Sequence, residues 1–316
     1  MSWRDELARE LAGAVLFKEP LARHTSYRIG GPAEAYVRPR DLEGVRRVLR
    51  IAVQAAVPVF VIGEGSNLLV SDRGVPGIVL NLREAAGGLR IRDEVVEVGA
   101  GLPLQEVVEA TARAGLAGLE NLAGIPGTVG GAVVMNAGAF GTEFFDLAFD
   151  IDVLTAEGEI LTVPRSQMDV GYRRGYVPVS GVILAARLRL ARGDRRKLEV
   201  RIREILERRA AKQPLEYPSC GSVFKRPPGD YAGRLIEASG CKGLRIGAAQ
   251  VSEKHANFIV NLGGATAEDV LAVIREVRRR VAEQFGVVLE PEVRFVGFDR
   301  PVAELLDVAT TGEGER

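Results

Sequence analysis

Three glycine-rich turns are the feature of this sequence best suited to chemistry, and that chemistry is the binding of a phosphate-bearing ligand. They lie around Gly30, Gly63 and Gly127, next to strand-like runs in one half of the chain. Glycine lets another group approach the main chain, and successive N–H groups in such turns bind anions. We therefore predict that the turns converge on one long ligand. The alternative is that the glycines only form tight turns at a buried sheet corner.

The segment 122–142 is the longest of these glycine-rich regions, with six glycines and no charged residue. Its length and the spacing of Gly127 and Gly131 are also found in packed membrane helices. We reject a membrane helix because Pro126 and the Gly130-Gly131 pair would interrupt it and because no basic cluster flanks it. We expect a segment of loops, turns and short strands against which a large ligand lies.

Two Gly-x-Gly motifs suggest a Rossmann dinucleotide site, but neither is complete. The first, at Gly63 and Gly65, lacks a third glycine, and the residues 68–70 continue as a strand where a helix should begin. The second, at Gly99 and Gly101, fails in the same way. An NAD-binding Rossmann protein and a non-catalytic nucleotide-binding module remain as alternatives.

Two further loops carry reactive side chains. The segment 171–176, Gly-Tyr-Arg-Arg-Gly-Tyr, is a charged and aromatic loop between strands and a plausible site element. Ser222 follows Gly221 in a proline-flanked loop, where serine is often only a turn or cap residue. Cys220 is either a proton donor or an ordinary buried thiol.

Periodicity and capping signals predict a mixture of helices and strands. Asp41 caps a helix, Pro103 opens another that runs to about Ala114, and Thr266 with Asp269 caps a third. The third of these helices is expected at 267–285, and further helices at 1–11, 194–212 and 231–239. Expected strands are 33–37, 58–62, 151–154, 160–163, 182–190, 258–262 and a closing strand from Val287.

Composition excludes several classes of function. The 42 basic and 42 acidic residues cancel, so no global charge recruits nucleic acid or an acidic membrane. Two histidines and two cysteines without ligand spacing argue against a metal site and against a disulfide framework. The amphipathic N-terminus is not a signal peptide. We expect a soluble, reduced, cytoplasmic protein of two or three compact units.

Four segments occur here in the order seen in the UDP-N-acetylenolpyruvoylglucosamine reductase family. They are Thr-Ser-Tyr-Arg-Ile-Gly-Gly (25–31), Gly-Glu-Gly-Ser-Asn (63–67), Gly-Ile-Pro-Gly-Thr-Val-Gly-Gly (124–131) and Gly-Ser-Val-Phe-Lys (221–225). The similarity runs from about His24 to Gly297 and includes the segments 251–261 and 289–294. The sequence therefore resembles this family along most of its length.

This resemblance implies a flavoenzyme of peptidoglycan precursor synthesis. NADPH would reduce noncovalently bound FAD, and a hydride would then pass to the enolpyruvyl group of a UDP-sugar. The implied α+β fold is a two-lobed FAD-binding domain of the vanillyl-alcohol-oxidase type plus a smaller α/β substrate-binding domain. The expected boundaries are 1–80 and 81–212 for the lobes, 213–286 for the substrate-binding domain, 287–300 for a closing strand that returns to the first lobe, and 301–316 for a flexible tail.

The resemblance also implies roles for individual residues. The catalytic positions fall on Arg173, Ser222 and Glu292: Arg173 would support an enolate-like state, Glu292 would orient or donate a hydrogen bond, and Ser222 would protonate the carbon. The residues expected to hold FAD are Tyr27, Arg28, Ile29, Gly63, Gly65, Ser66, Asn67, Gly124, Pro126, Gly127, Thr128, Gly130, Gly131, Ala132, Asn136 and Gly138. The substrate-binding positions are Lys225, Arg226, Lys254 and His255.

Some features depart from the family pattern or stay open. Arg226 stands where the family often has Asn, so its contact with the sugar is open. The chain lacks the tyrosine-bearing loop insertion of one subgroup and resembles the shorter subgroup. Lys254 and His255 either bind substrate phosphate or cap the strand that follows. A flavin oxidase of a small alcohol is the alternative enzyme, and we expect a monomer or weak oligomer that binds neither nucleic acid nor membrane.

Overall fold

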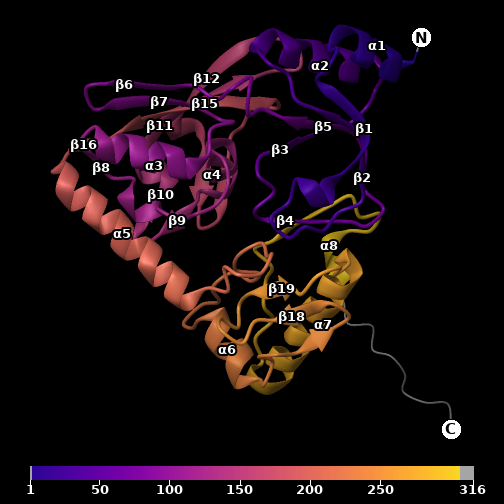
Figure 1. Cartoon of the computed structure of the whole chain (residues 1–316), viewed down its shortest axis with the longest axis vertical. Helices are drawn as coiled ribbons and strands as arrows, with labels where there is room; N and C mark the ends of the chain where they lie inside the picture. Colours follow the sequence, from indigo (N-terminus) through magenta and orange to yellow (C-terminus); the bar gives the residue numbers. More distant parts are fainter. Residues whose placement is uncertain (1, 307–316) are drawn as a thin grey trace. The chain divides into compact units, whose positions relative to one another are not determined.

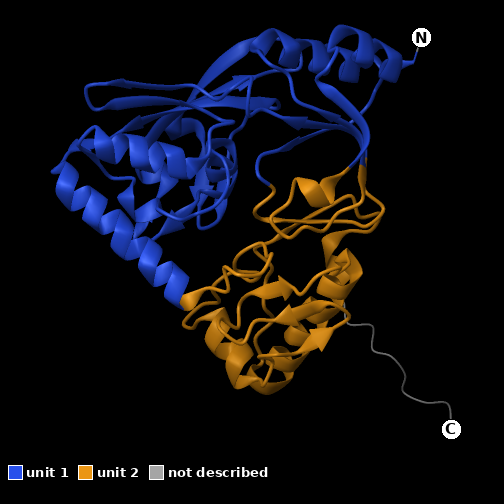
Figure 2. Cartoon of the chain, viewed as in Figure 1, with its two compact units in different colours: residues 1–19, 33–64, 76–211 blue, residues 20–32, 65–75, 212–316 orange. Residues whose placement is uncertain are grey.

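The computed structural model describes residues 2–306 and forms two compact units (Figure 2). Unit 1 comprises 1–19, 33–64 and 76–211, and unit 2 comprises 20–32, 65–75 and 212–316. The chain therefore passes from one unit to the other within the glycine-rich turn, between Glu64 and Gly65. Gly30 belongs to unit 2 and Gly127 to unit 1.

The N-terminal part of unit 1 builds a four-stranded sheet beside two helices. The strand order is β1-β2-β5-β3, with β3 parallel to β5. Apolar residues at helical spacing, such as Val45, Val48 and Ala52, are buried in a core shared with the sheet. The elements are α1 (Trp3–Glu10), β1 (Val15–Pro20), β2 (Pro32–Val37), α2 (Leu42–Gln54), β3 (Val59–Ile62) and β5 (Val75–Asn81).

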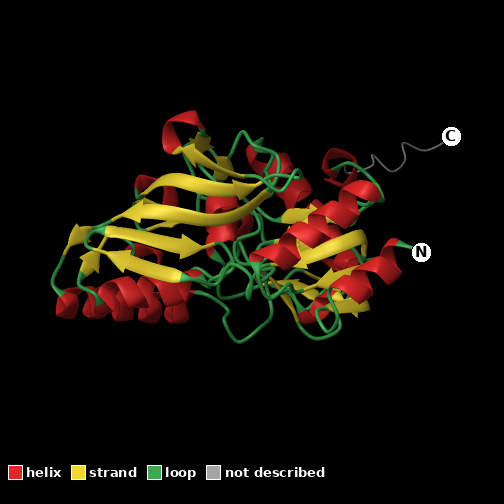
Figure 3. Ribbon diagram, turned by 90° about the horizontal axis from the view of Figure 1, so that it is seen from above, coloured by secondary structure: helices red, strands yellow, loops and turns green. Residues whose placement is uncertain are grey.

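The rest of unit 1 is a five-stranded antiparallel sheet of order β12-β11-β15-β7-β6, with three helices packed on one face (Figure 1). Figure 3 shows its strands as neighbouring yellow arrows. The expected strands 151–154 and 160–163 are confirmed and form a hairpin around Gly158, in which Leu154 pairs with Ile160. The elements are β6 (Leu89–Arg92), β7 (Val95–Gly99), α3 (Leu104–Arg113), α4 (Val129–Met135), β11 (Ala148–Leu154), β12 (Ile160–Pro164), β15 (Val182–Arg189) and α5 (Arg195–Lys212).

Short strand pairs complete unit 1. Each is a two-stranded sheet separate from the two larger sheets. The pairs are β8 (Leu116–Ala117) with β16 (Ala191–Arg192), β9 (Gly138–Ala139) with β10 (Thr142–Glu143), and β13 (Asp169–Gly171) with β14 (Arg174–Tyr176).

The helix α4 corrects the expectation that 122–142 contains only loops, turns and short strands. Thr128 caps it through an Oγ1 that accepts from the Gly131 N–H at 3.4 Å, and Asn136 ends it in the left-handed region at φ 41°. Gly130 and Gly131 lie in the first turn, where a Thr cap compensates for the cost of glycine. The periodic apolar residues Val129, Ala132 and Val133 are buried against the sheet.

Unit 2 combines an antiparallel sheet of order β17-β18-β19 with three α-helices and a parallel pair of strands, β4 and β20. The capping box of Thr266 with Asp269 and the left-handed Gly286 confirm the bounds expected for the long helix. The elements are β4 (Leu68–Val70), α6 (Ala232–Ala238), β17 (Arg245–Ile246), β18 (Ala249–Val251), β19 (Ile259–Asn261), α7 (Ala267–Phe285), β20 (Arg294–Val296) and α8 (Val302–Leu306).

The C-terminal segment differs from expectation in two ways. The closing strand expected at 287–300 is regular only over β20, which pairs with β4. The expectation of a flexible tail from residue 301 is wrong for residues 302–306. These residues form the helix α8, and Leu305 and Leu306 are buried in the core of unit 2. The remainder of that expected tail, 307–316, lies outside the described residues. Over the described chain, every helix is too short or too polar to cross a membrane.

Candidate active site

In unit 1, a carboxylate joins two of the glycine-rich turns. Oε2 of Glu64 accepts a hydrogen bond from the Gly127 N–H at 2.9 Å. Arg83 lies 3.6 Å from the other oxygen of Glu64. The Asn81 side chain donates to the carbonyls of Ile62 and Gly63 at 3.2 and 3.1 Å. Glu64 and Asn81 were not among the expected site residues; a carboxylate between two glycines of a turn is the signal that could have singled out Glu64.

The glycines of these turns serve two purposes. A Cβ at Gly63 would lie 2.5 Å from Thr128 Oγ1, and one at Gly65 would lie 2.4 Å from the His24 carbonyl oxygen. These two positions are glycine because the chain packs against itself there. A Cβ at Gly131 would meet only Thr128 Oγ1, at 3.9 Å, and Gly131 is exposed. The backbone at Gly131 is therefore open to the close approach of a ligand.

Most main-chain donors of the 124–132 segment already have acceptors within unit 1. The Gly124 N–H donates to Gln105 Oε1 at 2.8 Å, and those of Val129 and Gly130 donate to the carbonyls of Leu102 and Ala100 at 2.9 and 2.8 Å. The segment carries no charge, is held by its own hydrogen bonds and leaves few main-chain N–H groups for a ligand. Of the other expected cofactor positions, Pro126 is exposed and Ala132 is buried.

Arg173 lies in the turn of the β13–β14 hairpin, at φ 56°. Its Nη2 donates to the Gly138 carbonyl at 3.2 Å, and its guanidinium lies 4.9 Å from the ring centroid of Tyr172. A Cβ at Gly175 would lie 1.9 Å from the Val133 carbonyl oxygen, so the hairpin packs tightly on α4. The structure therefore places Arg173 beside Gly138, one of the expected cofactor positions.

Asn136, expected to hold the cofactor, is fully buried and makes contacts within unit 1. Its Nδ2 donates to Glu143 Oε2 at 2.6 Å and to the Gly171 carbonyl at 3.2 Å, while its Oδ1 accepts from the Phe145 N–H at 3.1 Å. The side chain therefore connects the end of α4 to the hairpin that carries Arg173. Its observed contacts hold this hairpin, and a role toward the cofactor stays a prediction.

In unit 2, the segments that carry Ser222 and Glu292 are paired. The Glu292 N–H donates to the Val223 carbonyl at 2.7 Å, and the Lys225 N–H donates to the Glu290 carbonyl at 2.8 Å. Phe224 and Pro291 form a β-bridge between these bonds. Two expected catalytic residues from distant parts of the sequence thus lie on neighbouring paired segments.

A buried asparagine holds the other side of the Ser222 segment. The Asn257 side chain accepts from the Phe224 N–H at 3.0 Å and donates to the Phe224 carbonyl at 2.9 Å. The main-chain carbonyl of Asn257 accepts from the Val223 N–H at 2.8 Å. Sequence reasoning did not assign Asn257 to the site. An Asn within the apolar run after His255 was the available signal, because a buried amide needs partners.

Cys220 is buried at 3% exposure beside the fully buried Tyr27. Burial raises the pKa of its thiol from an ordinary 9.0 to about 12. The alternative that Cys220 is the proton donor is disfavoured because the thiol is enclosed in the unit 2 core. The Tyr27 side chain is enclosed in the same core, so a cofactor contact from this residue would come from its main chain.

The expected substrate-binding residues of unit 2 have partners in the structure. Lys225 forms an ion pair with Glu290, and the Arg226 guanidinium lies 4.1 Å from the ring centroid of Tyr231. Lys254 Nζ is 3.9 Å from Glu216. His255 Nδ1 accepts from the Asn257 N–H at 3.2 Å, and burial lowers the pKa of the imidazole, which favours its neutral form.

The remaining expected cofactor residues of unit 2 lie in two turns. Thr25 Oγ1 donates to the Ile29 carbonyl at 2.8 Å and closes the turn in which Arg28 has φ 54°. The second turn contains Gly65, Ser66 and Asn67; the Gly65 carbonyl accepts from the Ser26 N–H at 3.4 Å. The two turns are therefore joined within unit 2.

These residues fit a noncovalent FAD. The 122–142 segment has no charged residue, and at Gly131 the main chain is open to a large planar ligand. The described residues contain no group of three or more His, Cys, Asp or Glu side chains placed to hold a metal ion.

Comparison with known proteins gives consistent matches. Residues 33–164 match the FAD binding domain family, and residues 213–296 match the C-terminal domain of UDP-N-acetylenolpyruvoylglucosamine reductase. The reductase of that name from Agathobacter rectalis is 45% identical over 296 residues, covering 90% of this chain and 94% of the relative. A second one, from Symbiobacterium thermophilum, is 47% identical over 286 residues, covering 90% and 93%.

A solved structure agrees. The crystal structure of the UDP-N-acetylenolpyruvylglucosamine reductase MurB from Thermus caldophilus superposes with a TM-score of 0.77 at 38% identity, covering 89% of this chain and 98% of that one. The expected α+β fold with an FAD-binding domain is thereby confirmed. The chain is an FAD-dependent oxidoreductase that belongs to the UDP-N-acetylenolpyruvoylglucosamine reductase family.

Proposed function

We propose that this protein reduces UDP-N-acetylglucosamine enolpyruvate to UDP-N-acetylmuramate with NADPH, in peptidoglycan precursor synthesis in the cytoplasm. The observation that carries the proposal is the pairing of the Ser222 and Glu292 segments, with the Glu292 N–H 2.7 Å from the Val223 carbonyl oxygen. It supports a site in which both residues act on the same substrate. When bound, FAD supplies the hydride chemistry.

Ser222 is the proposed proton donor. After the terminal vinyl carbon has gained a hydride, negative charge rests on the neighbouring carbon and its carboxylate. That carbon is basic enough to take the hydroxyl proton of Ser222, which the serine regains from solvent. Lys225 would ease the charge on the serine oxygen. Saturation of the enol ether to a lactyl ether then needs no further group.

Arg173 and Glu292 have supporting roles in this proposal. A planar guanidinium matches a carboxylate with two parallel hydrogen bonds, so Arg173 would stabilise the charge that develops on the substrate. Glu292 would orient the substrate or donate a hydrogen bond to it from a protonated carboxyl group. The short hairpin around Arg173 supports membership of the shorter subgroup, which lacks the tyrosine-bearing insertion.

The same proposal covers the binding residues. The positions expected to hold FAD in both units would do so noncovalently, since no histidine lies in the glycine-rich segments. Lys225, Arg226, Lys254 and His255 are candidates for binding the UDP-sugar, and residues 213–286 would form most of the substrate-binding domain. We infer a monomer or weak oligomer.

Two measurements test the activity. Purified protein should show a flavin absorption spectrum, and a protein that stays colourless after incubation with FAD would rule out the proposal. Under anaerobic conditions, NADPH-reduced enzyme should be reoxidised only when the UDP-enolpyruvyl sugar is added. Equal reoxidation with and without the sugar would contradict the reductase activity, and rapid reoxidation that occurs only after O2 is admitted would point to a flavin oxidase.

Substitution of the proposed acid tests the mechanism. Ser222→Ala should leave flavin reduction by NADPH within about twofold and slow the second half-reaction by about 10³-fold or more, because the lost group acts only in that step. Stopped-flow absorbance of the flavin separates the two half-reactions. Intact turnover in this variant would move the proton donor elsewhere.

A further inference from the structure

Asn67 lies next to Glu292 because two strands of unit 2 pair in parallel. The turn that contains Gly65 and Asn67 leads directly into β4, and Glu292 lies two residues before β20 begins. Leu68 pairs with Arg294 in the register of these strands. The family resemblance assigns Asn67 to the cofactor, whereas the strand register places it beside the proposed catalytic glutamate.

Two hydrogen bonds join Asn67 to the Glu292 segment. The side-chain Nδ2 of Asn67 donates to the main-chain carbonyl of Glu292 at 3.0 Å. The main-chain carbonyl of Asn67 accepts from the Arg294 N–H at 3.0 Å. The Glu292 N–H donates to a different partner, the main-chain carbonyl of Val223. Both main-chain polar groups of Glu292 are therefore held, one by the Ser222 segment and one by the Asn67 side chain.

We propose that Asn67 is a positioning residue for Glu292, a role that rests on the proposed function of this site. The amide is suited to the task because it donates a hydrogen bond to a neutral carbonyl. Removing it frees the Glu292 carbonyl, so the peptide plane rotates and the carboxyl group leaves its place. Displacement of a reacting or orienting group by about 1 Å can cost about 10²-fold in rate.

The kinetic test uses the FAD-loaded, full-length enzyme. Asn67→Ala should slow the second half-reaction about 10- to 100-fold, with flavin reduction by NADPH within about twofold and the Kd for FAD within about threefold. Asn67→Asp should behave like Asn67→Ala, because an ionised carboxylate cannot donate to the carbonyl. Equal slowing of both half-reactions together with loss of FAD would overturn the proposal and make Asn67 a cofactor residue.

A double mutant separates positioning from a direct effect. If Asn67 acts through Glu292, adding Asn67→Ala to Glu292→Gln should change the second half-reaction by less than about twofold. Full additivity of the two effects would overturn the proposal. Asn81→Ala is the matched control, because Asn81 donates to the Ile62 and Gly63 carbonyls at the other end of the glycine-rich turn. Its effect should fall on the Kd for FAD, and any effect on the second half-reaction should add to that of Glu292→Gln, because Asn81 does not act through Glu292.

Hydrogen exchange gives a readout that does not depend on activity. Asn67→Ala should accelerate amide exchange in a peptide covering residues 289–296 about three- to tenfold, while Asn81→Ala should not. Unchanged exchange in that peptide would overturn the proposal whatever the kinetics. A wild-type enzyme that fails to reduce the UDP-enolpyruvyl sugar would instead contradict the proposed function, and the exchange experiment would still decide whether Asn67 holds Glu292.

Discussion

Glu292 donates its main-chain N–H to the carbonyl oxygen of Val223 at 2.7 Å. Because Val223 follows Ser222 directly, this bond sets the spacing between the segments of two proposed catalytic residues. Asn257 forms three further hydrogen bonds with the Ser222 segment, two with Phe224 and one with Val223. Ser222 therefore lies in a segment that is hydrogen-bonded on both sides, which suits a proton donor that must keep its position.

Cys220 should be chemically inert although it lies two residues from Ser222. Burial raises its pKa to about 12, so almost no thiolate is present at pH 8, and the thiolate is the reactive form. In a Cys241→Ala background, we expect Cys220 to react with a disulfide reagent only as fast as the protein unfolds. Rapid labelling of the native protein would contradict this.

The raised pKa of Cys220 also predicts that the free energy of unfolding depends on pH. A pKa raised on folding contributes stability that is complete below the ordinary value of 9.0 and is lost as the pH rises toward about 12. Urea unfolding of Cys220→Ala should therefore show a flatter decline in the free energy of unfolding above pH 9 than the parent protein shows. Parallel curves would argue against a buried neutral thiol.

Glu64 should set the affinity for FAD through its hydrogen bond to the Gly127 N–H. Glu64→Gln keeps an acceptor and should change the Kd for FAD by less than about threefold, whereas Glu64→Ala should raise it about tenfold, the effect of one lost hydrogen bond. Flavin fluorescence measures both. Glu106→Gln is the control, because Glu106 contacts Arg83 at 3.2 Å but does not contact Gly127. Tighter binding by Glu64→Ala would mean that the carboxylate occupies a donor needed by the cofactor.

Arg173 should matter for its forked guanidinium and not only for its charge. Arg173→Lys keeps the charge, and we expect the second half-reaction to fall by about 10²-fold because two parallel bonds to a carboxylate are lost. Added guanidinium should partly restore Arg173→Ala. Arg174→Lys is the matched control, since Arg174 is exposed and pairs with Asp169 at 2.8 Å. Equal loss in both variants would indicate disruption of the hairpin.

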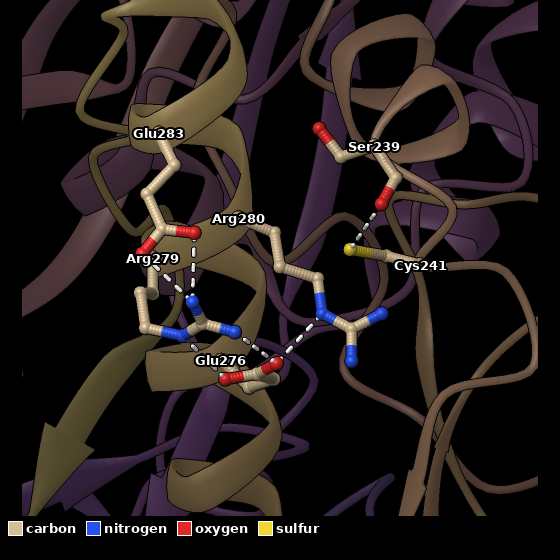
Figure 4. Close-up of polar contacts among 6 residues, drawn as sticks. All are labelled: Ser239, Cys241, Glu276, Arg279, Arg280 and Glu283. Carbon is tan, nitrogen blue, oxygen red and sulfur yellow. Dashed lines mark hydrogen bonds and ion pairs between the residues drawn. The ribbon is translucent and has the colours of Figure 1, made fainter.

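The charged cluster on α7 should contribute to stability and not to activity. Glu276 accepts from Arg279 and Arg280, and these hydrogen bonds hold the pKa of its carboxyl group at about 2 (Figure 4). Glu276→Gln should lower the free energy of unfolding by about 0.5–1 kcal/mol at pH 7 and low salt. Because the pKa is lowered, this contribution should be present above pH 4.5 and vanish as the pH falls to about 2. A difference that persists at pH 2, or any loss of turnover, would contradict this role.

Local signals in the sequence were sufficient to predict the helices and strands whose residues show clear periodicity and capping. The bounds of α7 follow from the capping box of Thr266 and Asp269 and from Gly286, and all three act within one turn of the helix ends. The β11–β12 hairpin follows from alternation on both sides of Gly158. The helix α4 was missed, because the glycine pair after Thr128 has low helix propensity and tertiary packing overrides it.

The site depended on tertiary structure to a larger extent. The sequence by itself determined the candidate residues and, through the order of its glycine-rich segments, the resemblance to a flavoenzyme family. It did not determine that Asn136 points into the core or that Asn67 reaches Glu292. A buried amide can bond to any carbonyl that packing brings within about 3 Å, and that partner is set by strand register between segments far apart in the chain. Only the folded structure decides which partner it is.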